Sequence, residues 1–218
     1  MKDKLLTALL GVTVALLVLT FSIGLPIYFR PFYYMQIEGL GVEETSGYSR
    51  EEIIEAYDEM LDYCIYPWAQ FGTGEMKYSD EGAAHFKDCK GLFILNGSVL
   101  LVSLLLLTSL IIMVKKKVFT PGRLLGFDVS FFSATGLLGV ISLIAGLASI
   151  NFEKAFTIFH KVMFPGKDNW LFNPYKDEII LVLPMEFFMR SAILIASSMV
   201  ILTATLITVG IIKRDKKA

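Results

Sequence analysis

Four long apolar stretches dominate this sequence of 218 residues. A helix needs about 20 predominantly apolar residues to cross the hydrocarbon core of a bilayer. The stretches 5–29, 91–114, 124–150 and 191–212 meet this requirement, and Asp128 is the one charged residue within them. They predict an all-α membrane protein with four transmembrane helices, and the hydrophobic content of 55% fits that class.

The first apolar stretch follows Lys2 and Lys4, as the apolar part of a cleaved signal peptide would. It is longer than such a part and lacks the small residues of a cleavage site at its end. We therefore expect it to be retained as a transmembrane helix.

The basic residues predict the orientation. Ten of the 20 Lys and Arg lie in three short pieces beside the apolar stretches: Lys2, Lys4, Lys115, Lys116, Lys117, Arg123, Lys213, Arg214, Lys216 and Lys217. Basic residues concentrate on the cytoplasmic side of membrane proteins. Both termini and the loop 115–123 are therefore expected in the cytoplasm, and 30–90 and 151–190 outside.

The two outer segments are acidic, because they hold 18 of the 21 Asp and Glu residues beside ten basic residues. The basic inner rim is typical of contact with anionic lipid headgroups, and nothing in the sequence indicates a nucleic-acid partner. No internal repeat or low-complexity linker divides the chain. We expect one domain, 1–218, with extracellular cap segments 30–90 and 151–190.

Two helices are predicted within the first outer segment. Ser49 and Glu52 form a capping box, and apolar residues then recur at helical spacing to Cys64. A helix over 50–64 should therefore lie on the membrane surface or on the tops of the transmembrane helices. A second helix should begin at Ser79 or Asp80 and continue into the second apolar stretch.

The chain has two histidines, His85 and His160, and both are expected outside, near a membrane boundary. His85 shares a helix face with Glu81, Asp88 and Cys89, because residues three and four apart are neighbours on a helix. Interfacial histidines are often no more than amphipathic anchors. A metal site would need carboxylates such as Asp88 and Asp177, since neither histidine has a typical metal-ligand spacing. We expect no metal.

Cys64 and Cys89 are both placed outside, where a disulfide is permitted. They could equally be two unreactive thiols, or Cys89 could be a nucleophile activated by His85. Glu186 and Arg190 lie four residues apart before the fourth stretch. That pair either positions the helix or serves function.

Several short motifs follow one another in the outer segments. The entry to the second stretch reads ExxxHxxD, and the segment after the third reads FHxxxF, W.F.P..D and P..FF. The motif residues are Glu81, His85, Asp88, Phe159, His160, Phe164, Trp170, Phe172, Pro174, Asp177, Pro184, Phe187 and Phe188. Together with the four spans and the outer cap, these motifs resemble the bacterial lipoprotein intramolecular transacylases, the Lit family, over essentially the whole chain.

The resemblance implies an enzyme of the bacterial cell membrane that acts on diacylated lipoproteins without a cofactor. It would move the sn-2 acyl chain of the diacylglyceryl group to the α-amino group of the N-terminal cysteine. Both histidines are catalytic in that family, so these roles would fall on His85 and His160. We also expect supporting or substrate-binding roles for Asp88, Tyr33, Trp170, Phe172, Asp177 and Arg190.

The chemistry of this transfer suits a histidine pair. An α-amino group has a pKa of about 8, so most of it is protonated near neutral pH and a base is needed. One histidine would take the amine proton, while the other histidine, Arg190 or Tyr33 would stabilise the oxyanion. Two alternatives remain: a four-span scaffold without enzymatic activity, and a different lipid-modifying enzyme that uses Cys89 as its nucleophile.

Overall fold

The computed structural model describes residues 1–215. Its contacts group into two compact units. Within the described residues, unit 1 comprises Met1–Leu25, Gly97–Leu147 and 194–215, and unit 2 comprises Pro26–Asn96 and Ala148–Ile193. Each unit is described by itself below.

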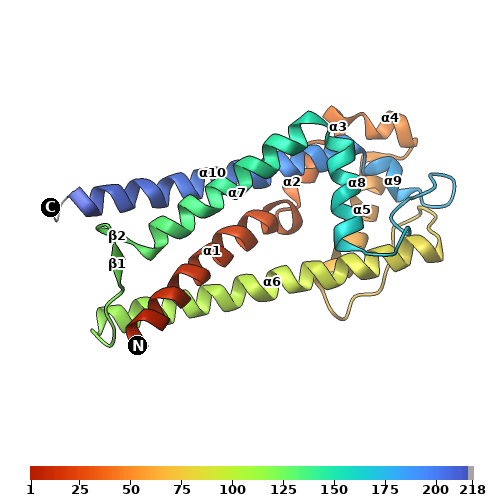
Figure 1. Ribbon diagram of the computed structural model, residues 1–218. Coiled ribbons are helices and arrows are strands. Elements are labelled where there is room, and N and C mark those ends of the chain that lie inside the picture. Colours follow the sequence, from red (N-terminus) through yellow and green to blue (C-terminus); the bar gives the residue numbers. More distant parts are fainter. Residues whose placement is uncertain (216–218) are drawn as a thin grey trace. The chain divides into compact units, whose positions relative to one another are not determined.

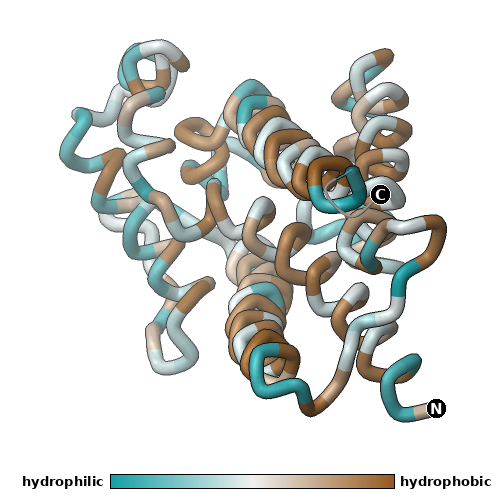
Figure 2. Tube along the Cα trace, turned by 90° about the vertical axis from the view of Figure 1, so that its left-hand side faces the viewer, coloured by the Kyte–Doolittle hydropathy of each residue, from teal (hydrophilic) through white to brown (hydrophobic). Residues whose placement is uncertain are grey.

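Four long helices confirm the membrane class. They are α1 (Lys2–Tyr28), α6 (Asp80–Lys115), α7 (Val129–Ile150) and α10 (Met185–Asp215), and each is long and apolar enough to span a bilayer (Figure 1). Figure 2 shows hydrophobic residues along these helices and hydrophilic residues near both termini. The four predicted spans are therefore confirmed as helices.

Helix α6 is longer than a bilayer requires. Its 36 residues extend over about 54 Å at 1.5 Å per residue, whereas the hydrocarbon core is about 30 Å thick. The apolar part begins at Gly91, so the first turns of α6, including His85, Asp88 and Cys89, precede the membrane-spanning segment.

A short hairpin corrects the predicted start of the third span. Strands β1 (Arg123–Leu124) and β2 (Phe127–Asp128) pair in an antiparallel sense, and α7 begins only at Val129. The turn places Leu125 at φ 54° and Gly126 at φ 81°, as a two-residue hairpin loop requires. Asp128, which had no evident partner in the sequence, accepts a hydrogen bond from the backbone N–H of Phe131 at 3.2 Å.

Unit 2 contains six shorter helices. They are α2 (Pro31–Tyr34), α3 (Ile37–Leu40), α4 (Val42–Ser46), α5 (Arg50–Ile65), α8 (Phe152–Met163) and α9 (Ile179–Val182). The predicted helix over 50–64 is confirmed as α5, which begins with the Ser49–Glu52 capping box. Its buried face joins a core that includes Phe86 of α6 and Phe187 of α10. Of the two surfaces proposed for this helix, the tops of the long helices are the one it covers.

The N-terminus of α6 is held by a carboxylate distant in sequence. Asp177 accepts hydrogen bonds from the backbone N–H and the hydroxyl of Ser79, both at 2.8 Å, and Ser79 Oγ accepts from the N–H of Gly82 at 3.0 Å. This pairing satisfies donors that the first turn of a helix leaves unpaired. It also fixes the segment around Asp177 to the helix that carries His85.

Helix α8 was not predicted from the sequence. Asn151 caps it by accepting a hydrogen bond from the backbone N–H of Lys154 at 2.8 Å. Among its residues His160 is buried, whereas Ile158, Phe159 and Val162 are largely exposed. Figure 1 shows α8 running across the direction of α6 in unit 2.

Candidate active site

The two histidines meet inside unit 2. His85 lies in the second turn of α6 and His160 in the last turn of α8, and their ring centroids are 5.8 Å apart. Their residues are only 5% and 8% exposed. The structure therefore brings together two side chains that are 75 positions apart in the sequence.

Aromatic rings enclose the pair. Phe164 lies 5.0 Å from His85 and 5.8 Å from His160 between ring centroids. Phe172 lies 5.4 Å from His85, and Trp170 lies 4.8 Å from His160. These three residues and Phe156, 4.1 Å from His160, form what we call the aromatic enclosure. Phe156 was not singled out in the sequence, although it precedes His160 by one helical turn.

His160 makes a hydrogen bond that defines its tautomer. Its Nδ1 lies 2.8 Å from the backbone carbonyl oxygen of Phe156. Because a carbonyl oxygen can only accept, Nδ1 must carry the proton. In neutral His160 the lone pair therefore resides on Nε2.

His85 is arranged differently. Its Nε2 lies 3.4 Å from Sγ of Cys89, one turn further along α6. Its Nδ1 is buried, and among residues 1–215 no hydrogen-bond partner reaches it. A buried polar atom without a partner is costly and rare in a folded protein, and a catalytic role is one of its known explanations.

Burial keeps both histidines neutral. It lowers the pKa of His85 to about 4, and the nearby His160 adds to this effect while Asp88 opposes it. Burial also lowers the pKa of His160, although the hydrogen bond to Phe156 acts in the opposite direction. Both imidazoles are therefore uncharged at neutral pH, so each has one N–H donor and one acceptor nitrogen.

Asp88 connects α6 to the loop that carries Trp170. Its carboxylate lies 2.6 Å from Lys167 Nζ and accepts a hydrogen bond from Asn169 Nδ2 at 3.2 Å. The indole N–H of Trp170 donates to the carbonyl oxygen of Lys167 at 3.1 Å. Asp88 is thus bound to the loop that carries Trp170, one ring of the enclosure. Lys167 and Asn169 were not identified from the sequence, because only the fold brings them to Asp88.

The other expected supporting residues make contacts outside the histidine pair. The buried Tyr33 donates its hydroxyl proton to the carbonyl oxygen of Val182 at 2.6 Å. Asp177 caps α6 through Ser79, and Arg190 pairs with Glu186. Among the described residues, none of these three side chains has a ring contact or hydrogen bond with His85 or His160.

Both cysteines are free thiols. Cys64 is buried beside the carbonyl oxygen of Phe86, at 3.8 Å from its Sγ. Burial raises the pKa of Cys89 to about 12, and the charge of Asp88 adds to this effect. Cys89 therefore remains protonated at neutral pH, which is unfavourable for a thiolate nucleophile. Within residues 1–215 no cluster of three or more His, Cys, Asp and Glu has the arrangement of a metal site.

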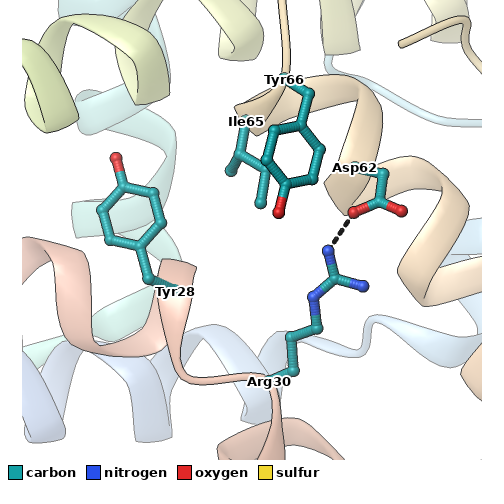
Figure 3. Close-up of a pocket in the computed structure, with 5 residues that line it drawn as sticks. All are labelled: Tyr28, Arg30, Asp62, Ile65 and Tyr66. Atoms are coloured by element: carbon teal, nitrogen blue, oxygen red, sulfur yellow. Dashed lines mark hydrogen bonds and ion pairs between the residues drawn. The ribbon is translucent and has the colours of Figure 1, made fainter.

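A separate pocket of about 540 Å³ lies beside the end of α1. Figure 3 shows its lining of Tyr28, Arg30, Asp62, Ile65 and Tyr66, with the guanidinium of Arg30 directed at Asp62. Arg30 also pairs with Asp58 at 3.0 Å. Neither histidine lines this pocket, and the pocket was not predicted from the sequence. The charge of Arg30 is already neutralised by Asp58 and Asp62.

Fold and site together define a class: a multi-pass membrane protein with two buried, neutral histidines inside an aromatic enclosure. The family model described as "Lipoprotein intramolecular transacylase Lit" matches residues 8–188. The chain belongs to this family.

Solved structures of a Bacillus cereus protein agree with this assignment. The membrane-integral lipoprotein intramolecular transacylase Lit of that organism is 25% identical, with a TM-score of 0.86 over 99% of this chain and 97% of that chain. Two further structures of it, with the mutations H85R and H85A in that protein, have TM-scores of 0.78 at 25% identity. They cover 99% of this chain and 93% and 95% of theirs. A comparison with curated protein sequences found no match.

Proposed function

We propose that this protein moves the sn-2 acyl chain of a diacylglyceryl lipoprotein to the α-amino group of the same molecule's N-terminal cysteine, with His85 and His160 as the catalytic residues. The observation that carries the proposal is the pair of buried histidines with ring centroids 5.8 Å apart in an aromatic enclosure. Membership of the transacylase family, matched over residues 8–188, supports the reaction class.

The reaction is an isomerisation. The neutral amine nitrogen attacks the ester carbonyl carbon and forms a tetrahedral oxyanion. The bond from that carbon to the glyceryl oxygen then breaks, which leaves an amide on the cysteine and a free hydroxyl at sn-2. The proton lost by the nitrogen is the one gained by the glyceryl oxygen, so the product has the same mass as the substrate.

His160 is the proposed base. The carbonyl oxygen of Phe156 holds its Nδ1–H, which leaves the Nε2 lone pair available. As the carbon–nitrogen bond forms, the nitrogen becomes far more acidic than the free ammonium. A histidine whose pKa is lowered by burial can therefore take this proton and pass it to the departing glyceryl oxygen.

His85 is the proposed donor to the oxyanion. A preorganised donor at a tetrahedral oxyanion contributes about 3 kcal/mol. The hydroxyl of Tyr33 is already engaged with Val182, and Arg190 is paired with Glu186. The buried Nδ1 of His85, which has no hydrogen-bond partner within residues 1–215, is better placed for this role.

The aromatic enclosure has a proposed role in orientation. Amine and ester of one lipoprotein are joined by a flexible chain, and holding two groups in attack geometry can supply several kcal/mol of the barrier. Rings of Phe164, Trp170 and Phe172 around the histidines would restrict the substrate in this way. They also keep out water, which would otherwise compete for the acyl group.

The proposed location is the outer headgroup level of the bacterial cell membrane, with both termini in the cytoplasm. The basic residues beside the long helices support this orientation. A lipid-anchored substrate presents its ester at that depth. The exposed apolar residues of α8, such as Ile158 and Val162, suit a helix that lies at the lipid boundary.

The test is mass spectrometry of the N-terminal peptide of a diacylated lipoprotein, co-expressed with wild type, His85→Ala or His160→Ala. We expect wild type to move one acyl chain to the amine at unchanged total mass. Each variant should lose this activity by about 100-fold or more while still accumulating in the membrane. A scaffold without enzymatic activity would leave the diacyl form unchanged even with well-inserted wild type.

A further inference from the structure

Cys89 is the one described side chain that hydrogen-bonds to His85. The two residues lie four positions apart on α6, so a regular helix brings them onto one face. Sγ of Cys89 is 3.4 Å from His85 Nε2, while Nδ1 on the opposite side of the ring is buried without a hydrogen-bond partner in the described residues. The two ring nitrogens of His85 therefore have unequal surroundings.

We propose that Cys89 is a positioning residue: its S–H donates to Nε2 of His85 and holds that ring as the tautomer protonated at Nδ1. The Nδ1–H is then the donor that the oxyanion accepts from. This inference rests on the proposed transfer reaction. It assigns one role to each histidine, with His160 as the base and His85 as the donor to the oxyanion.

The direction of the hydrogen bond follows from the chemistry of the two groups. Burial keeps Cys89 as a thiol, which carries a proton to donate, and sulfur is a weak acceptor. The lone pair of a neutral imidazole is the better acceptor of the two. The arrangement S–H to Nε2 is therefore favoured over Nε2–H to sulfur.

The opposite tautomer would also be unsuited to the reaction. A lone pair on Nδ1 would face a developing negative charge and repel it. It would also provide a second base beside His160, whose Nε2 already has that capacity. With the proton on Nδ1 the two histidines are complementary: one accepts and the other donates.

The same contact gives Cys89 a role other than that of a nucleophile. A covalent acyl intermediate would require its thiolate, which burial and the charge of Asp88 disfavour. A serine in its place can still donate a hydrogen bond, whereas an alanine cannot. These two replacements therefore separate positioning from mere packing.

The test combines nitrogen NMR with kinetics. The chain has only two histidines, so full-length protein labelled with ¹⁵N-histidine in bilayers gives few ring signals, and His160→Gln assigns those of His85. In wild type near pH 7.5 we expect His85 protonated at Nδ1 and unprotonated at Nε2. Cys89→Ala should give mixed tautomers and lower kcat by about 3- to 30-fold, less than loss of a whole oxyanion donor. Cys89→Ser should retain the tautomer and stay within about threefold of wild type.

Cys64→Ala is the matched control, because it removes the other thiol, which lies 3.8 Å from the carbonyl oxygen of Phe86 and makes no hydrogen bond with either histidine among the described residues. It should leave the His85 signals unchanged. Protonation of wild-type His85 at Nε2 would overturn the proposal, as would Cys89→Ala with unchanged signals and kcat. Loss of all activity in Cys89→Ala with the tautomer intact would also overturn it and favour a nucleophile. The NMR measurement needs no turnover, so it judges this proposal even where the transfer assay fails.

Discussion

His85 and His160 share one enclosure, yet their ring nitrogens face different partners. His160 donates from Nδ1 to a backbone carbonyl oxygen. His85 has its Nε2 beside a thiol, and no described residue forms a hydrogen bond with its Nδ1. Both have a lowered pKa because they are buried. At the scale of single residues, the hydrogen-bond partners of each imidazole therefore determine which of its nitrogens can donate and which can accept a proton.

The first prediction concerns pH. A pKa of about 4 leaves His85 neutral at every pH above about 5, so its protonation should not appear near 6.5, the ordinary value for histidine. Single-turnover rates should rise with the free-base fraction of the amine, which reaches one half at its pKa of about 8, and level above about pH 9. An additional inflection near pH 6.5 would contradict the account.

The second prediction concerns Asp88. Asp88→Asn removes the charge that pairs with Lys167 and loosens the loop that carries Trp170. We expect kcat to fall about tenfold, because Trp170 would no longer be held in its position in the aromatic enclosure. The loss of stability should be small, since partly exposed ion pairs contribute about 1 kcal/mol or less. Asp215→Asn, which removes a carboxylate from the exposed pair with Arg214, is the matched control and should leave activity unchanged. Equal activity of Asp88→Asn and Asp215→Asn would contradict the role of Asp88 in positioning the loop that carries Trp170.

Helix α6 organises the site at the scale of elements. Its first turns carry Gly82, His85 and Cys89 on one face, and its N-terminus is fixed by Asp177. Position 82 requires a glycine, because a Cβ atom there would collide with the carboxylate of Asp177 and approach Cε1 of Phe172 to 3.2 Å. The absence of a side chain thus allows cap, enclosure and helix to meet.

The third prediction follows from this packing. Gly82→Ala should displace Asp177 or Phe172 and destabilise the protein by about 1–3 kcal/mol, as overpacking does. At Gly91, on the same helix, an added Cβ would have no described atom within 4 Å, so Gly91→Ala should be neutral or stabilising by about 0.5–1 kcal/mol. Thermal unfolding of the purified proteins measures both. A Gly82→Ala variant at least as stable as wild type would disprove the close contact.

Some elements were predictable from the sequence for physical reasons. The four spans could be predicted because their length and apolarity are sufficient signals. Helix α5 could be predicted because a capping box precedes its amphipathic pattern. The hairpin at 123–128 was missed, since its apolar residues prolong the third stretch and only the positive φ of Leu125 and Gly126 interrupts it. Helix α8 was missed because its short amphipathic pattern adjoins a much longer apolar run.

The site was predictable only in part. Rarity and boundary position singled out the two histidines, and the family resemblance gave them a role. The partners of the two carboxylates could not be predicted, because they are distant in the sequence. Asp88 contacts Lys167, and Asp177 contacts Ser79, only in the folded chain. Tyr33 and Arg190 were expected to support catalysis, but their polar groups are engaged in other contacts.

The fourth prediction concerns the whole molecule in its membrane. Basic residues beside the long helices predict that both termini are cytoplasmic. A green fluorescent protein fused to the C-terminus should therefore fluoresce in bacterial cells, and an alkaline phosphatase fused there should be inactive. The reverse pair of results would invert the orientation and place the histidines on the inner side.

The central claim is that this histidine pair moves an acyl chain within one substrate molecule. The most direct measurement uses purified protein and an equimolar mixture of two lipopeptides, one with deuterated acyl chains and a distinguishable peptide. Mass spectrometry should find every amide-linked chain on the peptide that carried it as an ester, at unchanged mass, and no product with His160→Ala. Exchange of labelled chains between peptides, or full transfer by His160→Ala, would contradict the account.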